Sequence, residues 1–192
     1  MTSASVQPSS LEVLSHKRFS PREYTPELVP QDILERIFDS ARWSQSSFNE
    51  QPWRFLVAAR DGSSERSAIE ACLFEGNSFA KEAGLLGIAY YKTHFSHDGS
   101  FNRAAFFDTG AACQVVALQA FELGYNTRFM GGFHLEAARA LAQEGYEPAA
   151  MFVIGKATRS AIAEKRERKR KPLHEILRLR AWSSTNGLEK AD

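Results

Sequence analysis

The stretch SSFNEQPWRFLVAA, residues 46–59, changes from polar to apolar at Trp53 and marks the point where a loop enters the core. Its first part belongs to a polar loop at residues 44–52, which contains the serine, asparagine and proline that favour turns. Its second part, residues 53–59, is an apolar run ended by Asp61-Gly62, a pattern that predicts a buried β-strand. A polar turn therefore leads directly into a core strand.

Apolar runs and helical periodicity on either side of this stretch predict the other elements. Further strands are predicted at residues 84–91, 125–130 and 151–154. Helices are predicted at residues 10–14, with Ser10 as its cap, and at residues 30–41, with Pro30 in its first turn. Further helices are predicted at residues 64–73, 103–123, 135–144 and 173–179. Because the strands are separated by helices, the pattern indicates a layered mixed sheet covered by helices.

The longest predicted helix, at residues 103–123, is apolar nearly all round and ends at Gly124, as at a C-terminal cap. A helix with this pattern is buried on most of its faces. Its alanines and Gly110 permit the close approach of another helix, and a two-fold related partner is one natural source of that helix.

Length, composition and charge are those of an ordinary globular protein. The 192 residues include 24 Lys and Arg against 23 Asp and Glu, a net charge of +1, so nothing points to nucleic acid or an anionic membrane as partner. The N-terminus has no signal-peptide pattern, and no apolar run approaches the roughly 20 residues of a membrane span. Two isolated cysteines, Cys72 and Cys113, are typical of buried thiols in a reducing compartment. We therefore expect a cytoplasmic protein.

Several common catalytic motifs are missing from the sequence. It contains no G-x-x-x-x-G-K-[ST], G-x-G-x-x-G, H-E-x-x-H or paired C-x-x-C. His94 and His97 are three residues apart and could hold a metal, but a solvated loop is the better interpretation, and no metal site is predicted. No serine lies in a nucleophile elbow. Simple hydrolases and metalloenzymes are therefore disfavoured.

Three separated segments carry the polar and basic residues that could act together: KRFSPREY at 17–24, SSFNEQPW at 46–53 and RKRKP at 168–172. Taken singly, each segment has a simpler interpretation. Arg18 near the end of a helix could merely offset the helix dipole, the serine-asparagine segment is common in turns, and the basic run is typical of a solvated surface. Taken together, they resemble the FMN-dependent nitroreductase family, in which an arginine-x-serine-x-basic segment precedes S-S-x-N-x-Q-P-W. Residues 76–80 (GNSFA) and 130–133 (MGGF) resemble two further motifs of that family. The resemblance extends from about residue 11 to 177.

The resemblance implies the fold and assembly of that family. The fold would be an α+β three-layer sandwich, with a mixed, mainly antiparallel sheet flanked by helices, in an intertwined homodimer with two FMN sites. The FMN-binding domain would occupy residues 11–180, between a disordered tail at 1–10 and a polar tail at 181–192. The residues that the resemblance assigns to the cofactor are Arg18, Phe19, Ser20, Arg22, Ser46, Ser47, Asn49, Asn77, Gly131, Gly132, Arg168 and Arg170.

The phosphate of the flavin is assigned by the resemblance to Arg18, Ser20, Arg168 and Arg170. Guanidinium forks and a hydroxyl suit a phosphate, so no phosphate loop is required.

The isoalloxazine ring is assigned to other residues. The resemblance places Arg22 near the flavin N1 and O2, where a fixed cation stabilises the charge of the reduced ring. It places Asn77 at the pyrimidine edge and the backbone N–H groups of Gly131 and Gly132 near N5 and O4. The serine-asparagine turn at residues 46–49 is expected to come from the second subunit.

The implied activity is that of an NAD(P)H-dependent FMN oxidoreductase with a ping-pong mechanism. NAD(P)H would give a hydride to flavin N5, and a nitroaromatic, quinone or similar small acceptor would then take the same place over the ring. Because the flavin carries the chemistry, no catalytic side chain is assigned. The sequence leaves open the physiological acceptor and the choice between NADH and NADPH.

Departures from the family pattern leave other interpretations open. Gln45 stands where the family often has proline, and the loop at 92–102 is short, so whether it covers the flavin is open. Its Phe95 and Phe101 could stack on a flat substrate or simply pack. The chain could be a specialist of the same fold (a dehalogenase, a flavin-consuming enzyme or a ring dehydrogenase) or a non-catalytic flavin-binding protein. Nucleic-acid binding by residues 165–171 is disfavoured, because no aromatics are interleaved.

Overall fold

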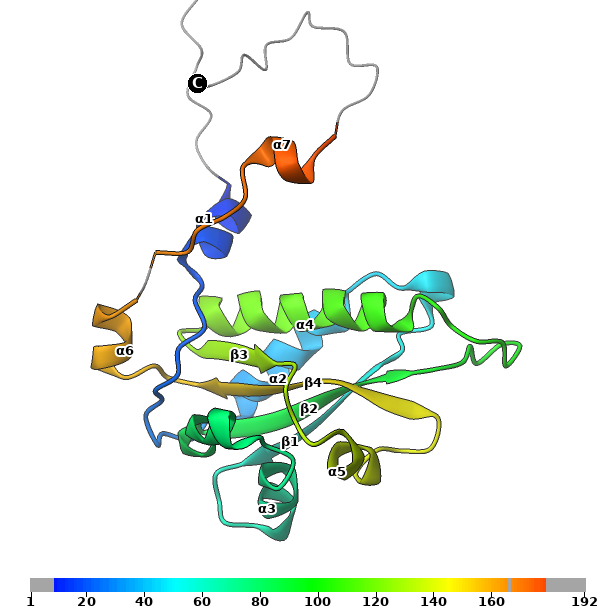
Figure 1. Ribbon diagram of the computed structural model, residues 1–192, viewed down its shortest axis with the longest axis horizontal. Helices are drawn as coiled ribbons and strands as arrows, with labels where there is room; N and C mark the ends of the chain where they lie inside the picture. Colours follow the sequence, from blue (N-terminus) through cyan, green and yellow to red (C-terminus); the bar gives the residue numbers. More distant parts are fainter. Residues whose placement is uncertain (1–8, 166, 179–192) are drawn as a thin grey trace, which may run out of the picture.

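The computed structural model describes residues 9–165 and 167–178, and it has a mixed α+β fold built on one antiparallel sheet. The four strands are β1 (Trp53–Ala59), β2 (Leu85–Lys92), β3 (Asn126–Met130) and β4 (Tyr146–Gly155). Their order across the sheet is β1-β2-β4-β3, and all three pairings are antiparallel (Figure 1). The predicted strands are thus confirmed, while the parallel pairing that a mixed sheet implies is not found among the described residues.

Strand β4 begins at Tyr146, five positions before the predicted strand at 151–154, because its first half does not read as an apolar run. Pro148 lies opposite Tyr90, where the register between β2 and β4 shifts. A proline has no N–H to donate to a ladder, so an irregularity is where a strand tolerates it.

The central strand β2 is buried along most of its length, and Gly87 shows how tightly it is packed. A Cβ at this position would lie 2.6 Å from the Phe152 ring and 2.7 Å from the Leu56 carbonyl oxygen. Both distances are too short for carbon, so the contact between the strands at this point requires glycine.

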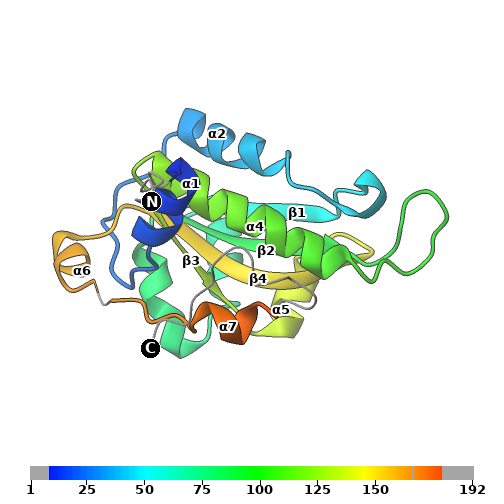
Figure 2. The ribbon, with the colours of Figure 1, turned by 90° about the horizontal axis from the view of Figure 1, so that it is seen from above.

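Two helices, α2 (Gln31–Ala41) and α4 (Ala105–Glu122), cover one face of the sheet and lie side by side in Figure 2. Their buried side chains, among them Ile37 and Val116, pack with Phe152 of β4. Both helices were predicted from apolar spacing, and both are confirmed.

The opposite face is covered by α3 (Ser64–Glu70), the 3-10 helix η2 (Glu75–Glu82) and α5 (Leu135–Ala140), as Figure 1 shows. The side chain of Arg66 is buried beneath these elements and is 2% exposed as a residue. Its guanidinium donates to the carbonyls of Ala58, Ala80, Lys81 and Ala83 and pairs with Glu70 at 2.7 Å. Arg66 thereby ties the end of η2 to β1.

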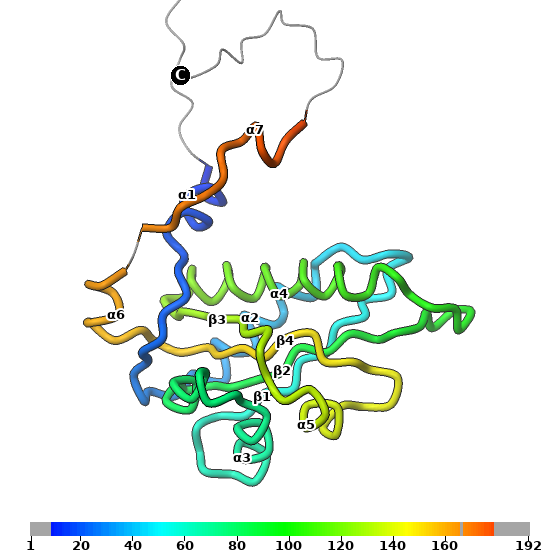
Figure 3. Tube along the Cα trace, viewed as in Figure 1, coloured from blue at the N-terminus to red at the C-terminus, as the bar shows by residue number. Residues whose placement is uncertain are grey.

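Helices α1 (Ser10–Lys17), α6 (Arg159–Ala163) and α7 (Leu173–Ile176) contain no buried residue. In Figure 3, the chain around residue 168 passes beside the end of α1. Ser9 caps α1 in a capping box with Glu12, one residue before the expected cap. Most of the expected tails, residues 1–8 and 179–192, lie outside the described residues. No helix in the described part of the chain combines the length and apolar character of a membrane span.

Candidate functional site

A cavity of about 810 Å³ lies where three distant segments of the chain meet. Residues 18–23 line it together with Arg128 of β3 and with Ala161, Glu164, Lys165, Arg168 and Arg170. A bridge between Tyr24 and Ala157, with a 2.8 Å hydrogen bond from the Thr25 N–H to the Lys156 carbonyl, holds the first two segments together. The volume is within the range of small-molecule sites.

The predicted phosphate residues lie together in this cavity. Arg18 donates from Nη1 to the Ser20 Oγ at 3.1 Å. Burial, and then the positive charges of Arg168 and Arg170, lower the pKa of Arg18. Three guanidinium groups are therefore held within electrostatic reach of one another, an arrangement that an anion would stabilise.

Hydrogen bonds within the protein hold Arg168 and the neighbouring Glu23 in place. Arg168 donates from Nη2 to the carbonyls of Ser15 and His16, both at 2.6 Å, at the end of α1. The Glu23 carboxylate accepts hydrogen bonds from the Thr158 and Ser160 hydroxyls at 3.0 and 2.6 Å. Among the described residues, no carboxylate forms an ion pair with the three arginines, so their charge is available to a ligand.

The G-N-x-F-A and double-glycine segments, which the resemblance assigns to the flavin ring, contact each other. The Asn77 side chain donates from Nδ2 to the Gly132 carbonyl at 2.8 Å, across 55 positions of sequence. Leu73 and Phe133 form a β-bridge beside it. A Cβ on Gly131 would meet no atom within 4 Å, so the backbone here is open to a close approach. The predicted contacts of the two glycine N–H groups with a ring stay a prediction.

Arg22 and Arg128 share one aromatic ring. The guanidinium carbon of each lies 5.6 Å from the centroid of Phe79 in η2. Sequence reasoning missed Arg128, although the predicted strand at 125–130 held the information. Successive side chains of a strand point to opposite faces, so a basic residue next to the core residue Phe129 had to face the other way.

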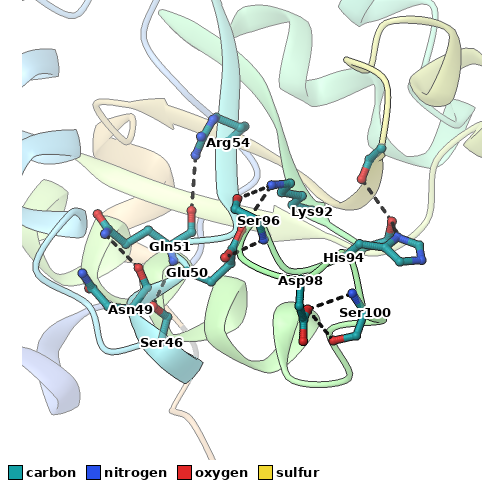
Figure 4. Close-up of polar contacts among 12 residues, drawn as sticks. Ser46, Asn49, Glu50, Gln51, Arg54, Lys92, His94, Ser96, Asp98 and Ser100 are labelled. Atoms are coloured by element: carbon teal, nitrogen blue, oxygen red, sulfur yellow. Dashed lines mark hydrogen bonds and ion pairs between the residues drawn. The ribbon is translucent and has the colours of Figure 1, made fainter.

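The serine-asparagine turn has a strained backbone that the surrounding polar groups hold in place (Figure 4). Phe48, Asn49 and Gln51 have φ of 52°, 54° and 50°, in the left-handed region that residues other than glycine rarely adopt. The Gln51 N–H donates to the Ser46 Oγ at 3.0 Å. Such strain persists where its surroundings impose it, and it is common at functional sites.

Helix α4 supplies a second anchor for the turn. The Ser47 N–H donates at 2.9 Å to the Oδ2 of Asp108, a carboxylate in the first turn of that helix. Asp108 is only 4% exposed.

The loop at 92–102 is fastened to the same turn through Glu50, whose side chain is 6% exposed (Figure 4). Its carboxylate accepts hydrogen bonds from Ser96 Oγ at 2.6 Å, the Ser96 N–H at 3.0 Å and Lys92 Nζ at 3.2 Å. Burial opposes ionisation, but these hydrogen bonds outweigh it and lower the pKa of Glu50. The turn and the loop therefore form one rigid unit.

Aromatic rings cover the outer side of this unit. Phe95 packs edge-on against Phe48 with ring centroids 5.6 Å apart, and His97 packs against both. Phe101 packs on His94 at 5.8 Å and is 66% exposed. Both loop phenylalanines thus make contacts within the chain, and stacking on a flat substrate stays a prediction.

One chain does not bring the turn and the arginine cavity together. The register aligns Trp53, Tyr91 and Glu147 at one end of the sheet, and Ala59, Leu85 and Ile154 at the other. The turn precedes Trp53, whereas the bridge that closes the cavity follows Ile154. A strand rises about 3.3 Å per residue, so about 20 Å of sheet separates them. That the turn serves the site of a second subunit stays a prediction.

The chain is similar to known proteins in sequence and in fold. A model of the Nitroreductase family matches residues 16–86. An NADH dehydrogenase of Thermus thermophilus is 35% identical over 74 residues, so the match spans 38% of this chain but only 35% of that relative. A Bacillus subtilis protein bearing the name NAD(P)H nitroreductase is 28% identical over 193 residues, 81% of this chain and 92% of that one. The crystal structure of an oxidoreductase containing FMN has a TM-score of 0.79 and 31% identity, covering 92% of this chain and 96% of that one.

Proposed function

We propose that this chain, which belongs to the nitroreductase family, is an NAD(P)H-dependent oxidoreductase that binds FMN in the cavity between residues 18–23 and Glu164, Lys165, Arg168 and Arg170. The observation that carries the proposal is the convergence of Arg18, Arg168 and Arg170. All three line one cavity, and the positive charges of Arg168 and Arg170 add to burial in lowering the pKa of Arg18. A doubly charged phosphate would offset this repulsion.

The residues around the cavity fit the rest of FMN as well. Arg22 offers a cation and Asn77 an amide at neighbouring points, and Gly131 leaves the backbone open. When bound, FMN supplies the two-electron chemistry between a reduced nicotinamide and a small acceptor, in ping-pong order. The chain's own residues bind the phosphate, orient the ring and stabilise its negative charge, so no side chain acts as general acid or nucleophile.

The proposed assembly is the intertwined homodimer of three-layer subunits. Helix α4 begins with Phe106 and Phe107, which are 60% and 71% exposed, and Trp43 is 85% exposed. Large aromatic side chains exposed to this extent mark an interaction surface. A partner subunit on this surface would cover them and would bring its own Ser46, Ser47 and Asn49 to the cavity.

The acceptor is proposed to be a nitroaromatic, a quinone or a similar flat molecule. Phe95 of the loop at 92–102 packs against Phe48 of the turn, and an acceptor that lies flat over the flavin ring would meet the cofactor face to face. A cytoplasmic location is proposed because Cys72 and Cys113 are free thiols.

The test is an absorption spectrum of the purified protein, recorded under argon before and after addition of NADH or NADPH. We expect a bound flavin spectrum that bleaches with one of the two nicotinamides and returns on addition of menadione or a nitroarene. Protein that takes up no FMN from excess would refute the proposal. Flavin that bleaches but does not reoxidise with either acceptor would favour a specialist enzyme, and flavin that does not bleach would favour a non-catalytic protein.

A further inference from the structure

We propose that Arg128 is a second cation of the flavin site, which acts with Arg22 on the pyrimidine side of the ring to favour reduced FMN over oxidised FMN. The inference rests on the proposed function and deepens it. Neither the sequence motifs nor the resemblance assigns a role to Arg128.

The position of Arg128 is fixed from two sides. Its Nη1 donates to the Ser20 carbonyl at 2.8 Å, and its guanidinium carbon lies 5.6 Å from the centroid of Phe79. Arg22 lies at the same distance from that ring. The cavity that holds the phosphate arginines is lined by both residues.

The arginines that line the cavity fall into two groups. The positive charges that act on Arg18 are those of Arg168 and Arg170. Burial lowers the pKa of Arg128, and the positive charge that adds to this effect is that of Arg22. The first group belongs to the phosphate end of the site, so the second group is free to serve a different part of the ligand.

The second group lies toward the ring end. Phe79 follows Asn77 by two residues in η2, and Asn77 contacts Gly132. The two guanidinium groups on Phe79 are therefore close to the amide and glycine that suit the pyrimidine edge. The acids that line the cavity, Glu23 and Glu164, form no ion pair with either arginine in the part of the chain that the structure describes.

Two unneutralised cations at this edge have a definite chemical consequence. Reduction by an electron pair leaves negative charge at the N1 and O2 side of the flavin, and a fixed positive charge there stabilises the reduced form more than the oxidised form. The differential affinity equals a rise in reduction potential. A reduced flavin poised in this way still reduces acceptors of higher potential, such as quinones and nitroarenes.

A purely structural role for Arg128 predicts something else. If Arg128 only tethers the Ser20 carbonyl, removing it would loosen residues 18–22 and weaken FMN in both redox states alike. The ratio of the two affinities, and hence the potential, would then stay unchanged. The reduction potential therefore distinguishes an electrostatic role of Arg128 from a purely structural one.

The experiment measures the midpoint potential of bound FMN and the dissociation constant of oxidised FMN in four proteins besides the wild type. Arg128→Gln keeps a donor for the Ser20 carbonyl but loses the charge, Arg128→Met loses both, and Arg128→Lys keeps the charge. Arg36→Gln is the matched control, because it removes one exposed arginine from α2 on the other face of the sheet.

We expect Arg128→Gln and Arg128→Met to lower the preference for reduced FMN about tenfold, which is about 30 mV for a two-electron couple. Arg128→Lys and Arg36→Gln should stay within about threefold of the wild type. A potential that is unchanged in both neutral variants, or lowered equally in Arg128→Lys, would overturn the inference. If Arg128→Met does not fold, Arg128→Gln decides between the two roles, because it keeps a donor for the Ser20 carbonyl and loses only the charge. Wild-type protein without FMN would instead refute the proposed function, and this inference with it.

Discussion

Replacing Arg18 by alanine tests the phosphate end of the site directly. Arg18 lines the cavity, contacts Ser20 and feels the charges of Arg168 and Arg170. In the complex it would contribute a charge-assisted hydrogen bond, worth roughly 1.5–3 kcal/mol. This converts to a rise of about 10- to 150-fold in the dissociation constant of FMN, because each 1.4 kcal/mol is tenfold.

The structure predicts that Arg18→Ala does not destabilise the protein without flavin. Arg18 is partly buried among like charges and lacks a carboxylate partner among the described residues, so its removal should leave the thermal midpoint of the apoprotein unchanged or raise it. Loss of affinity without loss of stability would separate a binding role from a folding role.

The assay is a titration of apoprotein with FMN, followed by the quenching of flavin fluorescence, with thermal melts of apoprotein in parallel. Melts with added inorganic phosphate give a second measurement, because a ligand raises the stability of the state that binds it. Phosphate should raise the thermal midpoint of the wild-type apoprotein more than that of Arg18→Ala. Arg42→Ala is the control, since Arg42 is exposed at the end of α2 and its one ion pair in the described part of the chain is with Asp39. A variant that keeps its full yellow colour after extensive dialysis, with an unchanged dissociation constant, would contradict the reasoning.

Three further predictions concern stability. Gly87→Ala should leave little soluble protein, because its Cβ would lie 2.6 Å from Phe152; normal yield and melting would contradict the packing described. Arg66→Met should lower the free energy of unfolding in urea by about 3–5 kcal/mol, since it removes a buried guanidinium that donates to four carbonyls and pairs with the partly exposed Glu70; a loss below about 1 kcal/mol would show that Arg66 is dispensable. The lowered pKa of Glu50 contributes stability that is present above the ordinary carboxyl pKa and is lost as pH falls through the folded value. The melting advantage of wild type over Glu50→Gln should thus shrink from pH 6 to pH 3, and a constant difference would disprove the assignment.

Regular elements of the fold were predictable because their side chains repeat with the period of the structure. Residues 53–59 are an apolar run between turn residues, and they form β1 within those bounds. The elements that were missed are short: η1 at Ser47–Asn49, η2 at Glu75–Glu82 and α6 at Arg159–Ala163. Helices of three to eight residues present too few positions for a clear periodicity, so tertiary contacts decide their conformation.

The candidate site was predictable only where a motif identified it. Arg18 and Arg170 are 152 positions apart, and no local rule brings them together; the resemblance did so. Arg128 belongs to no motif and was missed, although its place beside Phe129 in a strand defines its face. Glu50 was noted only as the variable position of S-S-x-N-x-Q-P-W, because its partner Ser96 becomes visible only when the loop is folded.

The distance between the two ends of the sheet has a thermodynamic consequence for the proposed dimer. Each chain would hold the phosphate in one site and supply the turn to the other, so neither site could be complete in a single subunit. FMN binding and subunit association must then be coupled by one factor. FMN strengthens the association of the subunits by the same factor by which their association strengthens FMN binding. Dilution would therefore separate the subunits and release FMN. A shortage of FMN would in turn weaken the association of the subunits.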